Sequence, residues 1–338
     1  MVTAFAPVNI AWVKYMGKTD EGPSNASFSM TLAGIGSRTR IERIGNSPEV
    51  IFDFEDSPYT PPASGKEKIH RFLTSIKPFS QALQEFGFDC EVEPGIYRIH
   101  TSNNVPAGTG IATSASGFAA LTLAWAAVLS GRRVHEWVDL YKTEPKAPDR
   151  LASIARLGSG SACRSFHGPF VEWTKDNRIL PFSMSGPGFV DFVLLLETES
   201  KKIPSSEAHK RVPTSPEFPK RADSVSGRIL RVKKALVEMD SSALCREVRE
   251  EALEMHELFH TSVPPFRYLN SDSEKWLSGA PLQGTPFSEA LITADAGANI
   301  HVFVREQESA RFQDFLEENH RGLRFIVAKA GNGAFYDS

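Results

Sequence analysis

The sequence predicts a protein of mixed α+β class built from two layered domains. Its 338 residues, 41% of them hydrophobic, are enough for two domains or one large one. Stretches with strand-like alternation and stretches with helical spacing follow one another without the regular repeat of a parallel barrel. Around residues 182–190 the composition shifts to Ser, Gly and Pro, so we expect one domain over 1–185 and another over 186–338.

The first half opens with the alternation of apolar and polar residues that is typical of strands. Apolar residues then recur at helical spacing over 66–86, which predicts one amphipathic helix. Strands are expected at 4–13, 27–32, 38–44, 50–54, 96–100 and 169–173, and further helices at 115–130, 134–142 and 148–157.

The second half starts with a strongly apolar strand at 189–196. Long helical patterns follow it, and shorter strands close the chain. Helices are expected near 220–239, 242–260 and 306–319, and strands at 290–294, 300–304 and 324–328.

Composition argues against several classes of partner. The net charge of −3 carries no basic excess, so nucleic acid is not expected as the main partner. The longest apolar run, 117–129, is too short to span a bilayer, and the N-terminus lacks the pattern of a signal peptide. Three widely spaced cysteines favour a reducing compartment over a disulfide framework. We therefore expect a cytoplasmic protein without a membrane partner.

The most informative segment is residues 106–117, PAGTGIATSASG, which precedes an apolar helical pattern. Its glycines leave backbone N–H groups accessible, and the helix that follows adds its unpaired amides and the positive end of its dipole. Together these features predict a seat for phosphate. The alternative is a turn of small residues that packs a helix tightly against a strand.

Two other segments carry cations or hydroxyls beside a glycine. Lys14 and Lys18 follow an apolar strand and flank an aromatic residue and Gly17, which suits binding of phosphates or a carboxylate. Solvated surface lysines are the alternative. Residues 158–165, GSGSACRS, combine flexible backbone with Arg164, whose guanidinium can grip a phosphate or carboxylate with two hydrogen bonds. Runs of Gly and Ser are otherwise simple turns.

A carboxylate and a histidine pair complete the candidates. Asp295 lies where a strand meets a glycine-containing turn, so it is either a general base or a cap of that turn. His256 and His260 form an H-E-x-x-H pattern on a predicted helix, which in zinc proteases places two ligands on one face. Glu274 or Glu289 is a possible third ligand. The alternative is two polar positions on a half-buried helix.

In this order, the segments resemble the GHMP family of small-molecule kinases and, within it, the mevalonate diphosphate decarboxylases. That family carries A-P-x-N-I-A-x-x-K-Y-W-G-K near its start, which residues 6–18 match with Met16 in place of Trp. The family's phosphate loop resembles residues 106–121, its R-x-G-S-G-S-A-C-R-S run resembles 156–165, and its D-A-G-x-N resembles 295–299. Residues 23–29 are similar to its P-x-N-x-S-x-S segment.

The resemblance implies a two-domain GHMP fold with a left-handed βαβ unit and an active site in the cleft between the domains. It also implies a reaction that uses ATP and Mg²⁺: the γ-phosphate passes to a tertiary hydroxyl of mevalonate 5-diphosphate, and loss of phosphate and CO₂ leaves isopentenyl diphosphate. Its members suggest a homodimer, and no metal is expected other than Mg²⁺ bound through the ATP phosphates.

The site residues that the resemblance implies fall into three groups. The catalytic group is Asp295, Lys14, Ser114 and Arg164. The substrate-binding group is Asn9, Tyr15, Lys18, Ser159, Ser161, Arg164 and Ser206. The ATP-binding group is Pro106, Gly108, Gly110, Ala112, Thr113 and Ser114.

Two departures from the family's sequence pattern leave other substrates as alternatives. Where the family often has Ser-Ser-x-x-Gly-Met, this chain has Ser205-Ser206-Glu207-Ala208-His209. With Glu207 and Met16 at these positions, mevalonate 5-phosphate is an alternative substrate. A plain GHMP kinase that makes a stable phosphorylated product is a second alternative, and a zinc metalloprotease built on His256, Glu257 and His260 is a remote third.

Overall fold

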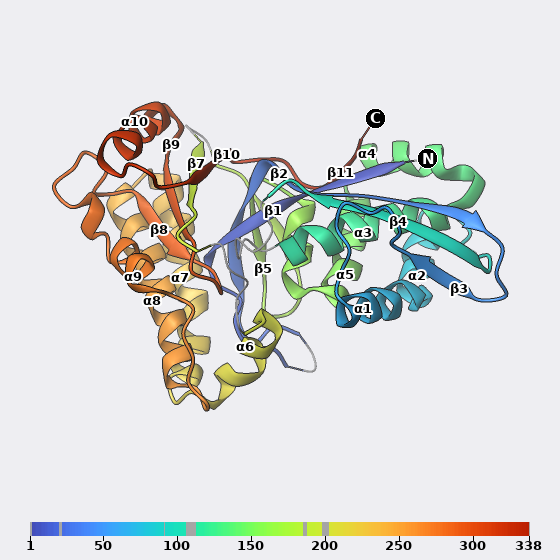
Figure 1. Ribbon diagram of the computed structural model, residues 1–338, viewed down its shortest axis with the longest axis horizontal. Helices are drawn as coiled ribbons and strands as arrows, with labels where there is room; N and C mark the ends of the chain where they lie inside the picture. Colours follow the sequence, from blue (N-terminus) through green and yellow to red (C-terminus); the bar gives the residue numbers. More distant parts are fainter. Residues whose placement is uncertain are drawn as a thin grey trace.

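The computed structural model describes residues 2–19, 22–90, 92–105, 113–184, 188–197 and 203–337. Two sheets organise these residues, one in each half of the molecule, with helices packed on them (Figure 1). The first sheet has the order β11-β1-β2-β4-β3, with β5 and β6 continuing from β2, and the second has the order β10-β7-β9-β8. The predicted α+β class is confirmed.

The strands of the first sheet are β1 (Thr3–Val13), β2 (Ser27–Gly45), β3 (Val50–Asp53), β4 (Gly95–Asn103), β5 (Phe170–Trp173), β6 (Ile179–Phe182) and β11 (Phe335–Asp337). The helices that follow or cover them are α1 (Ala63–Thr74), α2 (Ile76–Glu85), α3 (Thr113–Leu129), α4 (Val134–Thr143) and α5 (Lys146–Gly158). β3 and β4 pair in parallel and are connected through α1 and α2, which forms a β-α-β unit.

The second sheet consists of β7 (Phe189–Leu194), β8 (Leu291–Ala294), β9 (Ile300–Arg305) and β10 (Phe325–Lys329). Its helices are α6 (Ser205–Arg211), α7 (Phe218–Glu238), α8 (Ser241–Thr261), α9 (Ser271–Leu277) and α10 (Ser309–Asn319). The predicted boundary near residue 185 falls outside the described residues and stays a prediction. The last strand, β11, pairs with β1 in the first sheet.

Two predictions about single elements were wrong. The helix expected over 66–86 is two helices, because Ser75 leaves the helical region with φ −76° and ψ 73°. The strands expected at 27–32 and 38–44 are one 19-residue strand, β2. Gly36 lies within this strand opposite Pro7, where a Cβ would be 2.1 Å from the carbonyl oxygen of Ala6. The glycine therefore serves a close approach of two strands.

One hydrophobic core joins the two halves. Trp12 of β1 is fully buried, and its ring lies within 5.0–6.5 Å of the rings of Phe28, Phe170, Phe189 and Phe303 in both sheets. Apolar residues of α7 and α8 pack into the same cluster. The end of β1 is therefore held between the first sheet and the helices of the second half.

Helix α3 is buried on nearly all its faces, as its apolar sequence predicts. Among the described residues, no single helix is long and apolar enough to cross a membrane; only α3 taken together with Gly131–Thr143, at a bend of 116°, meets that criterion.

Candidate active site

A cavity of about 1520 Å³ lies between the two halves of the molecule. β1, the segment that follows it, α1, α3, α5 and α6 contribute to its wall, together with the turn after β8. Every predicted site residue that the structure describes lines this cavity: Asn9, Lys14, Tyr15, Lys18, Thr113, Ser114, Ser159, Ser161, Arg164, Ser206 and Asp295. Pro106, Gly108, Gly110 and Ala112 lie outside the described residues.

Lys14 and Asp295 meet at the centre of the site. Lys14 directly follows β1, and its Nζ lies 2.6 Å from Oδ1 of Asp295 and 2.6 Å from the carbonyl oxygen of Ala11. The Lys14 side chain is only 2% exposed, whereas that of Asp295 is 22% exposed. Register shifts in β1 between Pro7 and Asn9 and between Ala11 and Val13 turn this part of the strand toward the cavity.

Asp295 is an ionised carboxylate in this environment. Its burial acts to raise its pKa, but electrostatic interactions with Lys14, His301 and Arg164, together with the hydrogen bond from Lys14, outweigh that effect, and the pKa lies below its ordinary value. A carboxylate held ionised beside a buried ammonium can orient a hydroxyl and accept its proton.

Asn9 and Arg164 form a second group in the wall of the cavity. The Nε of Arg164 donates to Oδ1 of Asn9 at 3.1 Å, and its Nη1 donates to the hydroxyl of Ser27 at 2.7 Å. Asn9 in turn donates to the hydroxyl of Ser165 at 2.9 Å. Arg164 lies in the 3-10 helix Gly160–Phe166 and is 4% exposed. Its guanidinium is therefore oriented before any ligand arrives.

Tyr15 packs between two aromatic rings. Its ring centroid lies 4.8 Å from that of Trp173 and 4.5 Å from that of His209 in α6. Burial raises the pKa of Tyr15 to about 12, so its hydroxyl keeps its proton and can donate a hydrogen bond. His209 also accepts the N–H of Gly17 on its Nδ1 at 3.0 Å.

Ser114 and Ser159, one from each of the two small-residue segments, meet in the wall of the cavity. Ser114 lies in the first turn of α3, and its hydroxyl is 3.1 Å from that of Ser159, which follows α5. Gly158 allows this approach of α3 and α5, because a Cβ there would lie 2.1 Å from the ring of Phe118. The first turn of α3 contains no acidic residue, so its amides suit an anion.

Several cavity residues were missed by the sequence analysis. In the described part of the chain, seven cationic side chains and one carboxylate, Asp295, line the cavity. The cations are Lys14, Lys18, Lys68, Lys210, Arg71, Arg156 and Arg164. Burial lowers the pKa of Lys68, and the nearby charge of Lys18 lowers it further. Lys68 and Arg71 lie on the polar face of α1 without any local motif, so only the three-dimensional arrangement identifies them.

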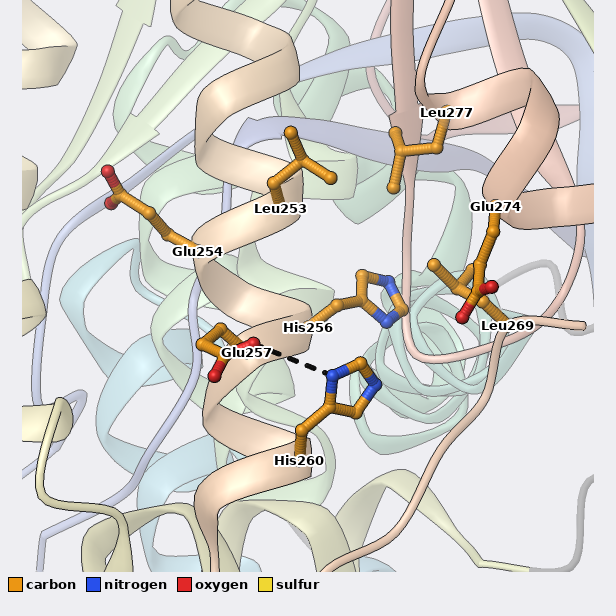
Figure 2. A pocket seen from close by; sticks show the side chains of 8 residues that line it. All are labelled: Leu253, Glu254, His256, Glu257, His260, Leu269, Glu274 and Leu277. Carbon is orange, nitrogen blue, oxygen red and sulfur yellow. Dashed lines mark ion pairs between the residues drawn. The ribbon is translucent and has the colours of Figure 1, made fainter.

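The H-E-x-x-H helix lines a separate, smaller pocket, shown in Figure 2. His256 is 2% exposed and neither of its ring nitrogens has a hydrogen-bond partner in the described structure, while His260 lies 3.6 Å from Glu257. Within the described ranges, no group of three or more His, Cys, Asp or Glu side chains is placed to hold a metal ion. The described residues therefore do not support the zinc-protease alternative.

The comparisons with known proteins agree with this geometry. Residues 6–183 match the profile of the diphosphomevalonate decarboxylase-like N-terminal domain, and residues 192–324 match that of the mevalonate 5-diphosphate decarboxylase C-terminal domain. The chain belongs to the diphosphomevalonate decarboxylase family. The first profile alone covers more than half of the chain.

Individual members of the decarboxylase family align over most of their length. The diphosphomevalonate decarboxylase of Aspergillus fumigatus is 30% identical, over 99% of this chain and 83% of the relative. That of Saccharomyces cerevisiae is 29% identical, over 91% and 78%. Solved mevalonate diphosphate decarboxylases superpose along nearly the whole chain: the Enterococcus faecalis structure has a TM-score of 0.80 at 27% identity, covering 100% of this chain and 98% of that one. The Legionella pneumophila structure has 0.77 at 28%, covering 96% and 99%.

The two departures from the family pattern lie in different settings. Met16 is 3% exposed, lines the cavity and packs in a cluster with Met255 and Phe259. Glu207 forms an ion pair with Arg211 at 2.9 Å and is not part of the cavity wall. The carboxylate of Glu207 is therefore compensated away from the site.

Proposed function

We propose that this protein catalyses the ATP-dependent decarboxylation of mevalonate 5-diphosphate. The products are isopentenyl diphosphate, ADP, phosphate and CO₂. The observation that carries the proposal is the buried Lys14–Asp295 pair. In the described cavity wall, Asp295 is the one carboxylate and Lys14 is one of seven cations. Such a wall suits two polyanions, and a solved family member of 27% identity and TM-score 0.81 holds MVAPP, AMPPCP and magnesium.

Asp295 acts on the tertiary hydroxyl in this proposal. The hydroxyl is a poor leaving group, so transfer of the γ-phosphoryl group of ATP to its oxygen is the first requirement. Asp295 orients the hydroxyl and accepts its proton, and Lys14 keeps Asp295 ionised. The bond between C3, the carbon that carried the hydroxyl, and the phosphorylated oxygen then breaks, and phosphate leaves. The carboxylate leaves as CO₂, and the electron pair of the carbon–carbon bond that held it forms the double bond. Lys14 and Arg164 offset the negative charge of these groups.

Two neighbouring seats hold the phosphates. Ser114 and the first-turn amides of α3 would hold the β- and γ-phosphates of ATP, together with the loop at 106–112. Mg²⁺, bound through the ATP phosphates, neutralises charge on the transferring group. Tyr15, Lys18, Ser159, Ser161 and Arg164 would hold the substrate diphosphate, and Asn9 and Ser206 complete its site. The 3.1 Å contact of Ser114 with Ser159 supports placing the binding sites for the ATP phosphates and for the substrate diphosphate next to each other.

The diphosphate is favoured over the monophosphate as the substrate. Glu207 would repel a second phosphate only if its charge faced the cavity, and it is paired with Arg211 instead. Lys18 and Lys210 remain as cations near α6, and both line the cavity. Mevalonate 5-phosphate is the second candidate, because Met16 alters the wall at this end.

One assay tests the reaction and the substrate together. The protein is incubated with ATP, Mg²⁺ and either mevalonate 5-diphosphate or mevalonate 5-phosphate, and ADP, phosphate and CO₂ are measured. We expect the three products in equal amounts and faster with the diphosphate. ADP without CO₂ would identify a plain kinase, and a higher kcat/KM with the monophosphate would reverse the substrate assignment.

We also propose that the protein works in the cytoplasm as a homodimer with two domains, 1–185 and 186–338. The composition and the family resemblance support these assignments. Light scattering of the purified protein tests the dimer, which requires twice the chain mass of 37.3 kDa.

A further inference from the structure

The main chain of Lys14 is held by charged side chains from the other half of the molecule. Its N–H donates to Oε1 of Glu251 at 2.9 Å. Its carbonyl oxygen accepts from Nδ2 of Asn25 at 2.8 Å and from Nη2 of Arg221 at 3.2 Å. Since β1 ends at Val13, the Lys14 peptide lies beyond the strand ladder and depends on these partners.

The group formed by Arg221 and Glu251 is deeply buried. Glu251 of α8 is fully buried and Arg221 of α7 is 4% exposed, and the two form a direct ion pair. Arg228, seven residues or about two helical turns further along α7, donates its Nη1 to the other carboxylate oxygen of Glu251 at 3.1 Å. Figure 1 shows the end of β1 beside α7 and α8. A fixed cluster of charges therefore lies behind the lysine, on the side away from the cavity.

Buried charges of this kind are a costly way to join helices. Removing two ions from water costs about as much as their attraction returns, and well-packed apolar residues often do as well for stability. Apolar residues already fill the core shared by α7 and α8, and Glu251 serves there as the acidic partner of the buried Arg221 and Arg228. What a carboxylate and a guanidinium add is a directed acceptor and a directed donor for the Lys14 peptide.

The position of that peptide decides where the Lys14 ammonium lies. Lys14 Nζ is held on Ala11 and Asp295 at 2.6 Å each, so a shift of the backbone would break one contact or the other. A displacement of about 1 Å at a reacting group can cost on the order of 100-fold in rate.

We propose that Glu251 and Arg221 are positioning residues for the reaction: they hold the Lys14 peptide so that its ammonium stays on Asp295. The inference rests on the proposed function. It assigns a role in the chemical step to two residues, Glu251 and Arg221, that do not line the cavity.

The test uses apolar and conservative variants together. In Glu251→Met the acceptor is lost, and in Glu251→Gln an oxygen of the same shape remains for the Lys14 N–H. We expect Glu251→Met to lower kcat at least tenfold, with the KM for ATP and for mevalonate 5-diphosphate changed less than threefold. Glu251→Gln should recover most of the lost kcat.

A double variant separates positioning from folding. Glu251→Met with Arg221→Met leaves neither partner of that ion pair alone, and Arg228, which loses Glu251, keeps its ion pairs with Glu247 and Glu254. We therefore expect the double variant to fold with a thermal midpoint near that of the single Gln variant. It still lacks both side-chain contacts with the Lys14 peptide, and we expect kcat to stay at least tenfold low.

Glu247 supplies a matched control. It lies one turn earlier on α8, is 5% exposed and pairs with Arg231 at 2.9 Å and Arg228 at 3.6 Å; its described ion pairs do not include Lys14. Glu247→Met should lower the thermal midpoint and leave kcat within twofold.

CO₂ release by the unaltered protein tests the proposed function by itself. The ratio of the kcat of each variant to that of the unaltered protein tests the positioning role. A folded double variant with normal kcat would overturn the positioning role. An equal loss of kcat in Glu247→Met would also overturn it, because the effect would then belong to helix packing.

Discussion

The Lys14 end and the Lys18 end of the cavity differ, although the two lysines are four residues apart in one segment. Lys14 is 2% exposed, is paired with Asp295, and has partners on both sides of its peptide. Lys18 is exposed, and within the described ranges no ion pair involves it. The charge that acts on Lys68 from nearby is that of Lys18.

This difference separates two uses of the same side chain. At the Lys14 end the ammonium is buried and paired, so charges interact strongly and their geometry is set before a ligand binds. At the Lys18 end, two cations approach each other without a carboxylate between them, which leaves a place for an anion. We therefore expect substitutions at the Lys14 end to change the rate of the chemical step, and those at the Lys18 end to change binding.

The largest effect is expected from Asp295→Ala. Loss of the proposed base should lower kcat by about 10²–10⁴-fold, while ATP affinity changes little because the nucleotide seat is at α3. Turnover assays and ATP titration calorimetry measure the two quantities. Asp176→Ala is the control, since Asp176 pairs with Arg178 outside the cavity wall. A near-normal rate for Asp295→Ala would show that the mechanism is wrong.

Lys14→Met tests whether the Lys14 ammonium lowers the pKa of Asp295. Lys14 is among the charges that hold the pKa of Asp295 below its ordinary value, and burial alone would raise it. The reaction needs the ionised carboxylate, so kcat falls as pH drops through the pKa of Asp295. Without the ammonium, the acidic limb of the kcat profile should move to higher pH.

The control for that profile is Lys142→Met, which removes an exposed lysine paired with Asp139 on α4. An acidic limb at the same pH in Lys14→Met and in the unaltered protein would contradict the assigned link. Activity in the alkaline range should still be reduced in Lys14→Met, because a cation beside the reacting groups is gone.

Much of the cavity end of this site could be predicted from the sequence, because its residues lie in short segments with local patterns. Lys14, Ser114, Arg164 and Asp295 each follow or precede a glycine-containing loop at the end of a strand or helix. Loops of that kind place side chains at the edges of sheets, and the structure brings the segments together.

The supporting residues could not be predicted in this way. Arg221 lies in the first turn of α7 and Glu251 in the middle of α8, and a charged residue in a long helix normally indicates a solvated face. Their contacts with Lys14 span 207 and 237 positions of the chain, and no spacing rule covers such distances. The break at Ser75 was missed for a related reason: the apolar spacing of α1 and α2 continues across it.

Lys18→Ala and Lys68→Ala test whether the Lys18 end of the cavity acts in substrate binding. Each removes one cation from the anion site, so we expect the KM for mevalonate 5-diphosphate or ATP to rise about tenfold, the equivalent of roughly 1.4 kcal/mol. The kcat should change less than threefold. Because the Lys18 end is open to solvent, the effect should shrink as salt is added. A kcat loss as large as that of Lys14→Met would remove the distinction between the two ends.

The last effect concerns folding stability near the Lys14 end. Burial lowers the pKa of His256 to about 3, and the charges of Lys14 and His260 add to that shift. The unfolded chain takes up a proton near the ordinary histidine pKa of about 6.5, whereas the folded protein does not. Stability is therefore complete above that pH and falls by about 1.4 kcal/mol for each unit of pH below it, until the folded pKa is reached.

His256→Leu removes the imidazole that takes up this proton in the unfolded chain. The difference in the free energy of unfolding between His256→Leu and the unaltered protein, measured by urea titration at pH 7, 6, 5 and 4.5, should change in favour of the variant as the pH falls. A difference that stays constant over this range would mean that His256 titrates alike in the folded and unfolded chain. The Lys14 end would then admit water and protons, and the contrast with the Lys18 end would rest on hydrogen bonds alone.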